Sequence, residues 1–263
     1  MFRLQIIGGG RMGEALVGGL LASGWSSTDL SVVEVFEGRR VELVERFPDL
    51  AVLPEPAPAS GVVVAVKPGD VAGAVRAAVD AGAEQVLSIA AGVTLASLQQ
   101  AAGPGVVVVR AMPNTPALVG QGASAIAGGE HAGPADLDWA ESVLGAVGRV
   151  VRVTEAQLDA VTGLSGSGPA YVFLVAEALI EAGVLVGLSR DVATELATQT
   201  LLGAATLLAE SDEGPEALRA GVTSPGGTTA AGLRALEQAG VRSAVLDAVV
   251  AATERSRELG RAT

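Results

Sequence analysis

Residues Leu4–Gly13 read LQIIGGGRMG, an apolar run that continues directly into a glycine-rich turn. The run has the length of a buried strand and a helical pattern follows it, so the turn is G-x-G-x-x-G between a strand and a helix. In that setting Gly8 permits a tight turn, Gly10 lets the backbone approach a pyrophosphate, and Gly13 lets helix and strand pack closely. A turn without a ligand is the alternative. We expect a dinucleotide cofactor here, held by Gly8, Gly10, Arg11, Met12 and Gly13.

The first half of the chain alternates short apolar runs with helical patterns. The runs are Leu4–Ile7, Ser31–Val35, Gly61–Val66, Gln85–Ile89 and Val106–Val109, and helix candidates lie near Gly13–Ser23, Arg39–Phe47, Val71–Asp80 and Leu95–Ala101. Continuous apolar strands joined by helix-length crossovers indicate a parallel sheet covered on both faces. This pattern predicts a doubly wound, Rossmann-type α/β domain. Two further strands, Ala123–Ala127 and Arg149–Val153, would complete the sheet around a helix at Pro134–Leu144.

The second half of the chain has no strand signals and reads as helix as far as Ser256. Its helical pattern is interrupted at Gly163–Pro169, Gly187–Ser189, Ser211–Pro215 and Val222–Gly227. Thr154 is a plausible helix N-cap, with Gln157 at the capping-box position. We therefore expect two domains, a dinucleotide-binding domain at residues 1–153 and an all-helical domain at residues 154–263. Leu53–Ser60, which contains three prolines, is expected to be a surface loop.

Charge and composition exclude several classes of protein. The chain has 29 acidic and 17 basic residues and a formal net charge of -12, which repels nucleic-acid backbones and anionic lipid. It has no cysteine, so disulfides, thiolate metal sites and cysteine nucleophiles are excluded. We predict no metal site. Arg3–Ile7 runs directly into a core strand without a charged leader, and we expect a cytoplasmic protein.

The longest apolar run, Tyr171–Leu188, could be mistaken for a membrane span. Glu177 and Glu181 lie one helical turn apart within it, which favours a helix buried at a protein interface and no membrane. Together with Val192–Leu208, this run carries more apolar surface than a helical half-domain should bury alone. Self-association of the chain is therefore expected.

Glu34 closes the second predicted strand, about twenty residues past the glycine turn. A carboxylate there can accept hydrogen bonds from the adenosine ribose and would repel a 2′-phosphate, which favours NADH. Two observations leave NADPH open: Arg11, Arg39 and Arg40 could reach a 2′-phosphate, and Glu34 could be a solvated strand end.

Three further segments follow predicted strands and should line the same crevice, because open α/β sheets bind ligands at the carboxyl ends of their strands. They are Val66, Lys67 and Pro68; Ala90, Ala91 and Gly92; and Met112, Pro113 and Asn114. Lys67 is the only lysine of the chain, and a simple loop charge is its alternative reading.

The inventory of proton donors is small, with one His, one Tyr and one Lys: His131, Tyr171 and Lys67. Reduction of a carbonyl needs such a donor beside the hydride acceptor. The Tyr-x-x-x-Lys pair of short-chain dehydrogenases is absent, since Val175 follows Tyr171 at that spacing. β-Hydroxyacid dehydrogenases have a lysine where this chain has Val172. Carbonyl chemistry of either kind is therefore disfavoured.

A second distinctive segment, Leu218–Ala230, contains the turn Ser-Pro-Gly-Gly-Thr and runs into a helical pattern. Free backbone N–H groups, hydroxyls and the helix dipole would make this turn an anion pocket, and a well-capped helix start is the alternative. Together with Met112–Pro116 and Leu164–Tyr171, the segment resembles the pyrroline-5-carboxylate reductase family, in order along essentially the whole chain. The stretch Thr223–Glu237 is specific to that family.

The resemblance implies the last step of proline synthesis, in which hydride passes from NADH or NADPH to the imine carbon of L-1-pyrroline-5-carboxylate, which becomes C5 of L-proline. A cyclic imine is basic enough to arrive protonated, so the small inventory of acids is sufficient. By motif position, the substrate carboxylate would be held by Ser224, Pro225, Gly226, Gly227 and Thr228, while Thr229 would hydrogen-bond the ring nitrogen as the catalytic residue.

The resemblance also implies a homodimer built from the C-terminal helices, with each active site combining one subunit's Rossmann domain and its partner's helices, and often a decamer of such dimers. The chain departs from the usual pattern at Arg11, Gly13 and Glu34, which puts the dinucleotide preference in doubt. Two other functions stay open: a related reductase acting on another cyclic imine or a keto acid, and a dinucleotide sensor without catalysis.

Overall fold

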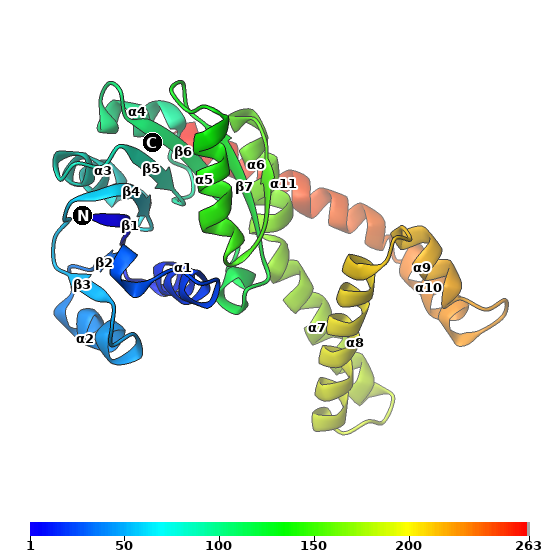
Figure 1. The fold of residues 1–263 in the computed structure, drawn as a ribbon. Coiled ribbons are helices and arrows are strands. Elements are labelled where there is room, and N and C mark those ends of the chain that lie inside the picture. The colour runs from blue at the N-terminus through cyan, green and yellow to red at the C-terminus, as the bar shows by residue number, and fades with distance from the viewer. Residues whose placement is uncertain (262–263) are drawn as a thin grey trace. The chain divides into compact units, whose positions relative to one another are not determined.

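The computed structural model describes residues 1–261. The chain forms two compact units, one made of residues 1–167 with the end of the chain from Val250, and the other of residues 168–249. Each unit has its own architecture. The first holds an eight-stranded sheet, and the second is helical throughout its length (Figure 1).

The sheet of the first unit has the strand order β3-β2-β1-β4-β5-β6-β7-β8. Its strands are β1 (Phe2–Ile7), β2 (Leu30–Val33), β3 (Ala51–Leu53), β4 (Ala59–Val64), β5 (Gln85–Ser88), β6 (Val107–Met112), β7 (Gly122–Gly128) and β8 (Gly148–Arg152). Neighbouring strands are parallel except for β6 and β7. The order changes direction at β1 and β4, so their carboxyl ends form the switch point at which such sheets bind ligands.

Both faces of this sheet are covered, which explains why its strands are apolar on both sides. On β4, Val63 faces a core with α1 (Arg11–Ala22), α2 (Glu37–Arg46) and α5 (Pro134–Gly145). Val62 and Val64 face the opposite core, with α3 (Val71–Asp80), α4 (Leu95–Ala102) and α6 (Leu158–Val161). Figure 1 shows the strands between these helices. The predicted doubly wound sheet is confirmed.

Three details of the predicted sheet are wrong. The segment expected as a loop at Leu53–Ser60 contains the end of β3 and the start of β4, and the loop itself covers residues 54–58. The sequence pattern does not indicate strand β3, because the strand is only three residues long, half-buried, and at the edge of the sheet. Strand β7 runs antiparallel to β6, with Ala111 paired to Ile126, because only a short connection separates the two. Strand β2 also ends at Val33, before Glu34.

The helical unit contains α7 (Gly168–Leu185), α8 (Arg190–Glu210), α9 (Pro215–Gly221) and α10 (Thr228–Gln238), and α11 (Val241–Arg261) begins in it. Helices α7 and α8 pack closely, and a Cβ at Gly183 would lie 2.9 Å from that of Ala193. Within the interruption expected at Gly163–Pro169, a π-helix at Thr162–Gly166 is followed by a bend at Ser167, and α7 begins at Gly168.

The division into compact units comes later in the chain than the change from strands to helices at Thr154. Leu158 packs in the sheet core, and Ser256 Oγ donates to Asp159 Oδ1 at 2.7 Å. These contacts hold residues 155–167 and the end of α11 against the sheet. Thr154 does form the expected capping contact, donating its N–H to Gln157 Oε1 at 2.9 Å. The domain limits given by the sequence stay a prediction.

Two helical segments, Glu155–Leu185 and Arg190–Glu210, are long and apolar enough to cross a membrane by length and composition alone. Within the single chain α7 is not buried, since Phe173 is 63% exposed and Leu174 is 65% exposed. The apolar surface that the sequence suggested is therefore present, and the chain by itself leaves it uncovered.

A charged pair joins the middle of the sheet to the start of the helical segments. Arg110 on β6 is 9% exposed and its Nη1 lies 2.9 Å from Glu155 Oε1, which also accepts from the N–H of Leu95 at 2.6 Å. Loss of the carboxylate would leave a buried guanidinium without a counter-charge, whereas loss of the arginine leaves a carboxylate that water can reach.

We expect Glu155→Ala to lower the free energy of unfolding by about 2 kcal/mol and Arg110→Met by about 1 kcal/mol. Thermal denaturation of the two variants measures the difference. Arg152→Met is the matched control, because Arg152 pairs with Glu141 and Asp138 at an exposed position. An equal loss of stability in all three variants would contradict the assignment.

Candidate functional site

The glycine turn has the geometry that a bound pyrophosphate requires. Gly8 has a positive φ of 108°, and a Cβ there would lie 2.5 Å from the carbonyl oxygen of Ala65. A Cβ at Gly13 would overlap the carbonyl oxygen of Gly8. Gly10 is the N-cap of α1 and has no atom within 4 Å of its Cβ position. The approach to the helix N-terminus is therefore open, where anions bind.

A cavity of about 350 Å³ lies at the carboxyl edge of the sheet. It is lined by Met12, Ala65, Val66, Pro68, Ile89, Ala90, Ala91, Met112, Pro113, Asn114, Thr115 and Gly166. Most residues predicted from the three strand ends are brought together here. Two are not: Lys67 is exposed and outside the lining, and Gly92 lines a neighbouring, largely apolar cavity of about 400 Å³.

Asn114 has a structural role that the sequence did not reveal. Its Oδ1 accepts from the N–H of Ala123 at 2.8 Å, and its Nδ2 donates to the carbonyl of Ser165 at 3.0 Å. The side chain therefore ties the end of β6 to β7 and to the π-helix. Gly166, which the sequence analysis also missed, faces Met112, whose Cε lies 2.7 Å from a Cβ built there.

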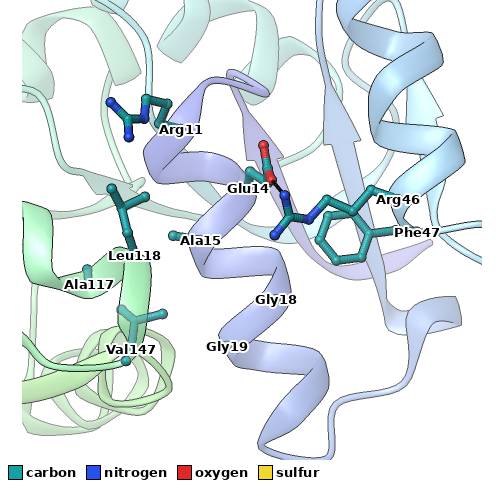
Figure 2. Close-up of a pocket in the computed structure, with 11 residues that line it drawn as sticks. Arg11, Glu14, Ala15, Gly18, Gly19, Arg46, Phe47, Ala117, Leu118 and Val147 are labelled. Atoms are coloured by element: carbon teal, nitrogen blue, oxygen red, sulfur yellow. Dashed lines mark ion pairs between the residues drawn. The ribbon is translucent and has the colours of Figure 1, made fainter.

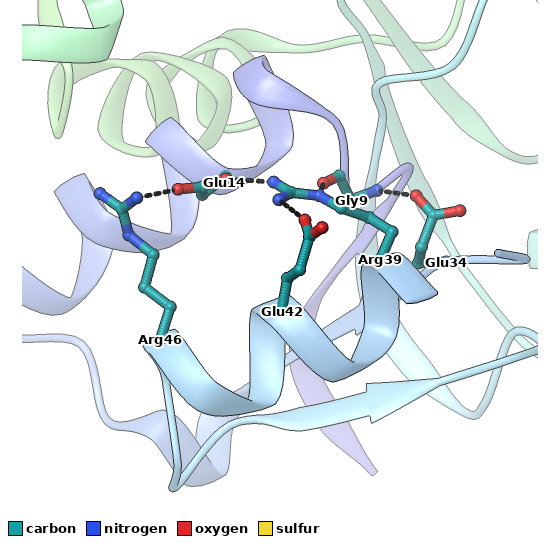
Figure 3. A network of polar contacts seen from close by, with 6 residues as sticks. All are labelled: Gly9, Glu14, Glu34, Arg39, Glu42 and Arg46. Carbon is teal, nitrogen blue, oxygen red and sulfur yellow. Dashed lines mark hydrogen bonds and ion pairs between the residues drawn. The ribbon is translucent and has the colours of Figure 1, made fainter. Parts of the chain in front are cut away.

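Glu34 lies just beyond β2 and is 8% exposed, so its alternative reading as a solvated strand end is wrong. Its Oε2 accepts from the N–H of Gly9 at 3.0 Å (Figure 3). Its Oε1 accepts from the N–H of Phe36 at 2.9 Å. The carboxylate is thus fixed beside the glycine turn. Val35 and Phe36 follow as exposed apolar side chains, and the sequence analysis gave them no role.

The three arginines near the turn lie in different surroundings. Arg39 is held by Gly9, Glu14 and Glu42, and Arg40 Nη1 donates to the carbonyls of Glu34 and Val35 at 3.0 and 2.8 Å. Arg11 lines a separate hollow of about 370 Å³ beside α1, shown in Figure 2 with Leu118 and Val147 on its wall. This hollow shares no lining residue with the cavity at the sheet edge.

The predicted substrate turn lies in the helical unit, between α9 and α10. Gly226 has a positive φ of 72°, and a Cβ at Gly227 would meet the hydroxyl of Ser224. Gly227 is the N-cap of α10, so Thr228 and Thr229 stand in the first helical turn, where backbone N–H groups have no acceptor within the helix. Both threonines are exposed in the single chain. The turn can therefore receive an anion.

Clusters of metal-ligating side chains and His or Tyr proton donors are sparse in the part of the chain that the structure describes. Residues 1–261 contain no group of three or more His, Asp or Glu side chains placed to hold a metal ion. His131 is exposed in the loop before α5. Tyr171 donates its hydroxyl to the carbonyl of Ala248 at 3.5 Å within the helical unit.

Comparison with protein families gives two matches. Residues 155–259 match the family "Pyrroline-5-carboxylate reductase dimerisation", and residues 3–92 match "NADP oxidoreductase coenzyme F420-dependent". The chain is 48% identical to a pyrroline-5-carboxylate reductase of Mycobacterium tuberculosis, over 98% of this chain and 97% of that protein. It is 45% identical to one of Synechocystis, over 98% of each.

Solved structures agree with the sequence relatives. A pyrroline-5-carboxylate reductase from Coxiella burnetii superposes with a TM-score of 0.93, at 35% identity over 98% of each chain. The pyrroline carboxylate reductase of Plasmodium falciparum, solved with NADP bound, gives a TM-score of 0.83 at 29% identity over 98% of each chain. Identity at this level over nearly the whole length establishes the family. The chain belongs to the pyrroline-5-carboxylate reductase family.

Proposed function

We propose that the chain holds NAD(P)H at the carboxyl edge of its sheet and its substrate at the turn before α10. As a member of its family it is an oxidoreductase that reduces L-1-pyrroline-5-carboxylate to L-proline in proline biosynthesis. The observation that carries this conclusion is the 42–48% identity to curated reductases over at least 98% of the chain.

The glycine turn and the cavity beside it fit the two halves of a dinucleotide. Gly8, Gly10, Met12 and Gly13 would hold the pyrophosphate at the N-terminus of α1, with Arg11 next to it. The cavity lined by Val66, Pro68, Ala90, Ala91, Met112, Pro113 and Asn114 would hold the nicotinamide half, with Lys67 and Gly92 at its margin. The bound cofactor supplies the hydride.

The turn before α10 would bind the substrate by its carboxylate. Ser224, Gly226 and Thr228 are exposed at a helix N-terminus, where a negative charge is stabilised, and they would offer backbone N–H groups and hydroxyls, while the N–H of Gly227 donates to the carbonyl of Ser224 at 3.0 Å. Thr229 then lies in the first helical turn, where its hydroxyl would contact the ring nitrogen. Because a cyclic imine arrives protonated, a hydroxyl contact and a fixed substrate carboxylate would suffice to orient the imine carbon for hydride transfer.

We propose NADH rather than NADPH as the preferred cofactor. Glu34 is buried and its carboxylate is held by the N–H groups of Gly9 and Phe36, so it cannot swing away from the ribose. Each oxygen keeps a lone pair for a ribose hydroxyl, and the fixed charge would repel a 2′-phosphate. The exposed ring of Phe36 offers the adenine an apolar surface. NADP in the Plasmodium relative keeps NADPH as the alternative.

We further propose a cytoplasmic homodimer, which can assemble into a decamer. The match to a dimerisation family over residues 155–259 and the exposed apolar side chains of α7 and α8 support self-association. In such a dimer the substrate turn of one subunit would serve the cofactor of its partner. Burial against a second copy also accounts for the two apolar helices without a membrane.

The cofactor and substrate are tested together by following oxidation of NADH and NADPH with pyrroline-5-carboxylate. We expect turnover with both and a higher kcat/KM with NADH, because the Glu34 carboxylate repels the 2′-phosphate. Glu34→Gln removes that charge and should shift the NADPH to NADH ratio of kcat/KM about tenfold toward NADPH. Glu37→Gln, an exposed carboxylate three residues later, is the matched control and should leave the ratio unchanged.

Other outcomes of this assay separate the alternatives. Faster turnover of a six-membered cyclic imine or a keto acid would assign the chain to a related reductase. Cofactor binding without oxidation would assign it to a sensor. An unchanged cofactor ratio in Glu34→Gln would refute the role of Glu34.

Thr229→Val should lower kcat about 10- to 100-fold, because the isosteric side chain lacks the hydroxyl for the ring nitrogen. Thr229→Ser keeps that hydroxyl and should retain most of the activity. The Kd for NADH, measured by fluorescence, should be the same in all three proteins. Normal turnover in Thr229→Val would remove Thr229 from the catalytic role.

Light scattering at micromolar concentration should give the mass of two subunits or a multiple of it. Phe173→Asp places a charge on the exposed apolar side of α7 and should shift the protein toward a single subunit. Val119→Asp, also at an exposed apolar residue but in the sheet unit, should leave the mass unchanged. A monomeric wild-type protein is the result that would overturn the dimer.

A further inference from the structure

Gly9, in the middle of the proposed cofactor turn, is held by hydrogen bonds at both its backbone N–H and its carbonyl oxygen. Its N–H donates to Glu34 Oε2 at 3.0 Å, and its carbonyl oxygen accepts from Arg39 Nε at 2.8 Å. Figure 3 shows the turn between these two side chains. Glu34 follows β2, whereas Arg39 lies on α2, so two consecutive segments of the chain fix the two peptide groups that flank Gly9.

Each of the three nitrogens of Arg39 already donates to an acceptor of the protein, which fixes the orientation of the guanidinium. Its Nη1 donates to Glu42 Oε2 at 2.7 Å, and its Nη2 pairs with Glu14 on α1. The side chain is 27% exposed and that of Glu14 only 16%. Hydrogen bonds to Glu42 and Glu14 raise the pKa of Arg39 above its usual value, so the guanidinium stays charged at every working pH.

The contacts continue to the protein surface. Glu14 Oε1 lies 2.5 Å from Nη1 of Arg46, which is 68% exposed (Figures 2 and 3). Removal of Arg39 would therefore leave the half-buried Glu14 with only this outer partner. It would also free the carbonyl of Gly9 on the side opposite Glu34.

We propose that Arg39 is a positioning residue for the dinucleotide, which acts through the carbonyl of Gly9 and does not bind a 2′-phosphate. This inference rests on the proposed dinucleotide site and assigns Arg39 a contribution common to both cofactors. Arg40 makes different contacts from Arg39. Its Nη1 donates to the carbonyls of Glu34 and Val35, just beyond the end of β2. Of the two neighbouring arginines, Arg40 is the one placed at the ribose end of the site.

A 2′-phosphate ligand and a positioning residue predict different patterns of cofactor affinity. A 2′-phosphate ligand contributes to the affinity for NADPH alone. A residue that fixes the pyrophosphate turn contributes equally to NADH and NADPH, because both carry the same pyrophosphate. Once the cofactor is saturating, loss of such a residue leaves the reacting groups where they were, so kcat and the KM for pyrroline-5-carboxylate stay the same.

The experiment measures the Kd of NADH and NADPH by fluorescence titration of the full-length protein, together with steady-state kinetics. Arg39→Met keeps the aliphatic stem and removes the donors, and it should raise both Kd values by the same factor, about tenfold. Arg39→Lys keeps the positive charge and has one donor nitrogen in place of three, and it should restore part of the affinity. Arg46→Met removes an arginine from the same helix and the same carboxylate without touching Gly9, and it should change either Kd less than about twofold.

Each outcome decides between the roles. A loss confined to NADPH in Arg39→Met would make Arg39 a 2′-phosphate ligand, and unchanged Kd values would remove it from the cofactor site; either result overturns the proposal. If Arg39→Met does not fold, the same comparison is made with Arg39→Lys, for which an equal, smaller rise in both Kd values is expected and unchanged values overturn it. A wild-type protein that binds neither dinucleotide would instead refute the proposed function.

Discussion

The contact between Gly13 and the carbonyl of Gly8 is the constraint on which the site depends, because no side chain fits between them. It fixes the N-terminus of α1 against the end of β1, and β1 is next to β4 at the switch point of the sheet. The neighbouring Gly9 then donates its N–H to Glu34 and accepts at its carbonyl oxygen from Arg39. The proposed pyrophosphate site thus depends on one close approach of two backbone segments.

Much of the fold could be predicted from the sequence, since buried parallel strands are apolar on both faces and five such runs are plain in the first half. The errors occur where the local pattern carries little information. Strand β3 is three residues long, and the direction of β7 depends on its pairing with β6 rather than on its own composition. The glycines at 163 and 166 suggested a break, yet the chain forms a π-helix, in which Ser167 donates its N–H to the carbonyl of Thr162 at 2.8 Å.

The candidate site shows a similar division. Motifs revealed the glycine turn, the strand ends and the turn before α10, because each lies within a few consecutive residues. The sequence did not reveal that Asn114 bonds Ser165, or that Arg39 bonds Gly9, since these pairs are 51 and 30 residues apart. Periodicity identifies which residues face a core but says nothing about which polar groups meet across it. The ambiguity over the arginines came from this limit.

The few proton donors of the chain are consistent with a substrate that needs none. In the helical unit, Tyr171 is directed to the carbonyl of Ala248, and Glu237 near the end of α10 is paired with Arg242 at 2.8 Å. The groups at the predicted substrate turn are backbone N–H groups and hydroxyls, which stabilise a carboxylate and can orient an iminium but cannot protonate a carbonyl oxygen. A keto acid would lack its proton there, whereas a cyclic imine brings its own. If the turn binds the substrate as proposed, its chemistry would therefore select for basicity of the substrate as well as for its shape.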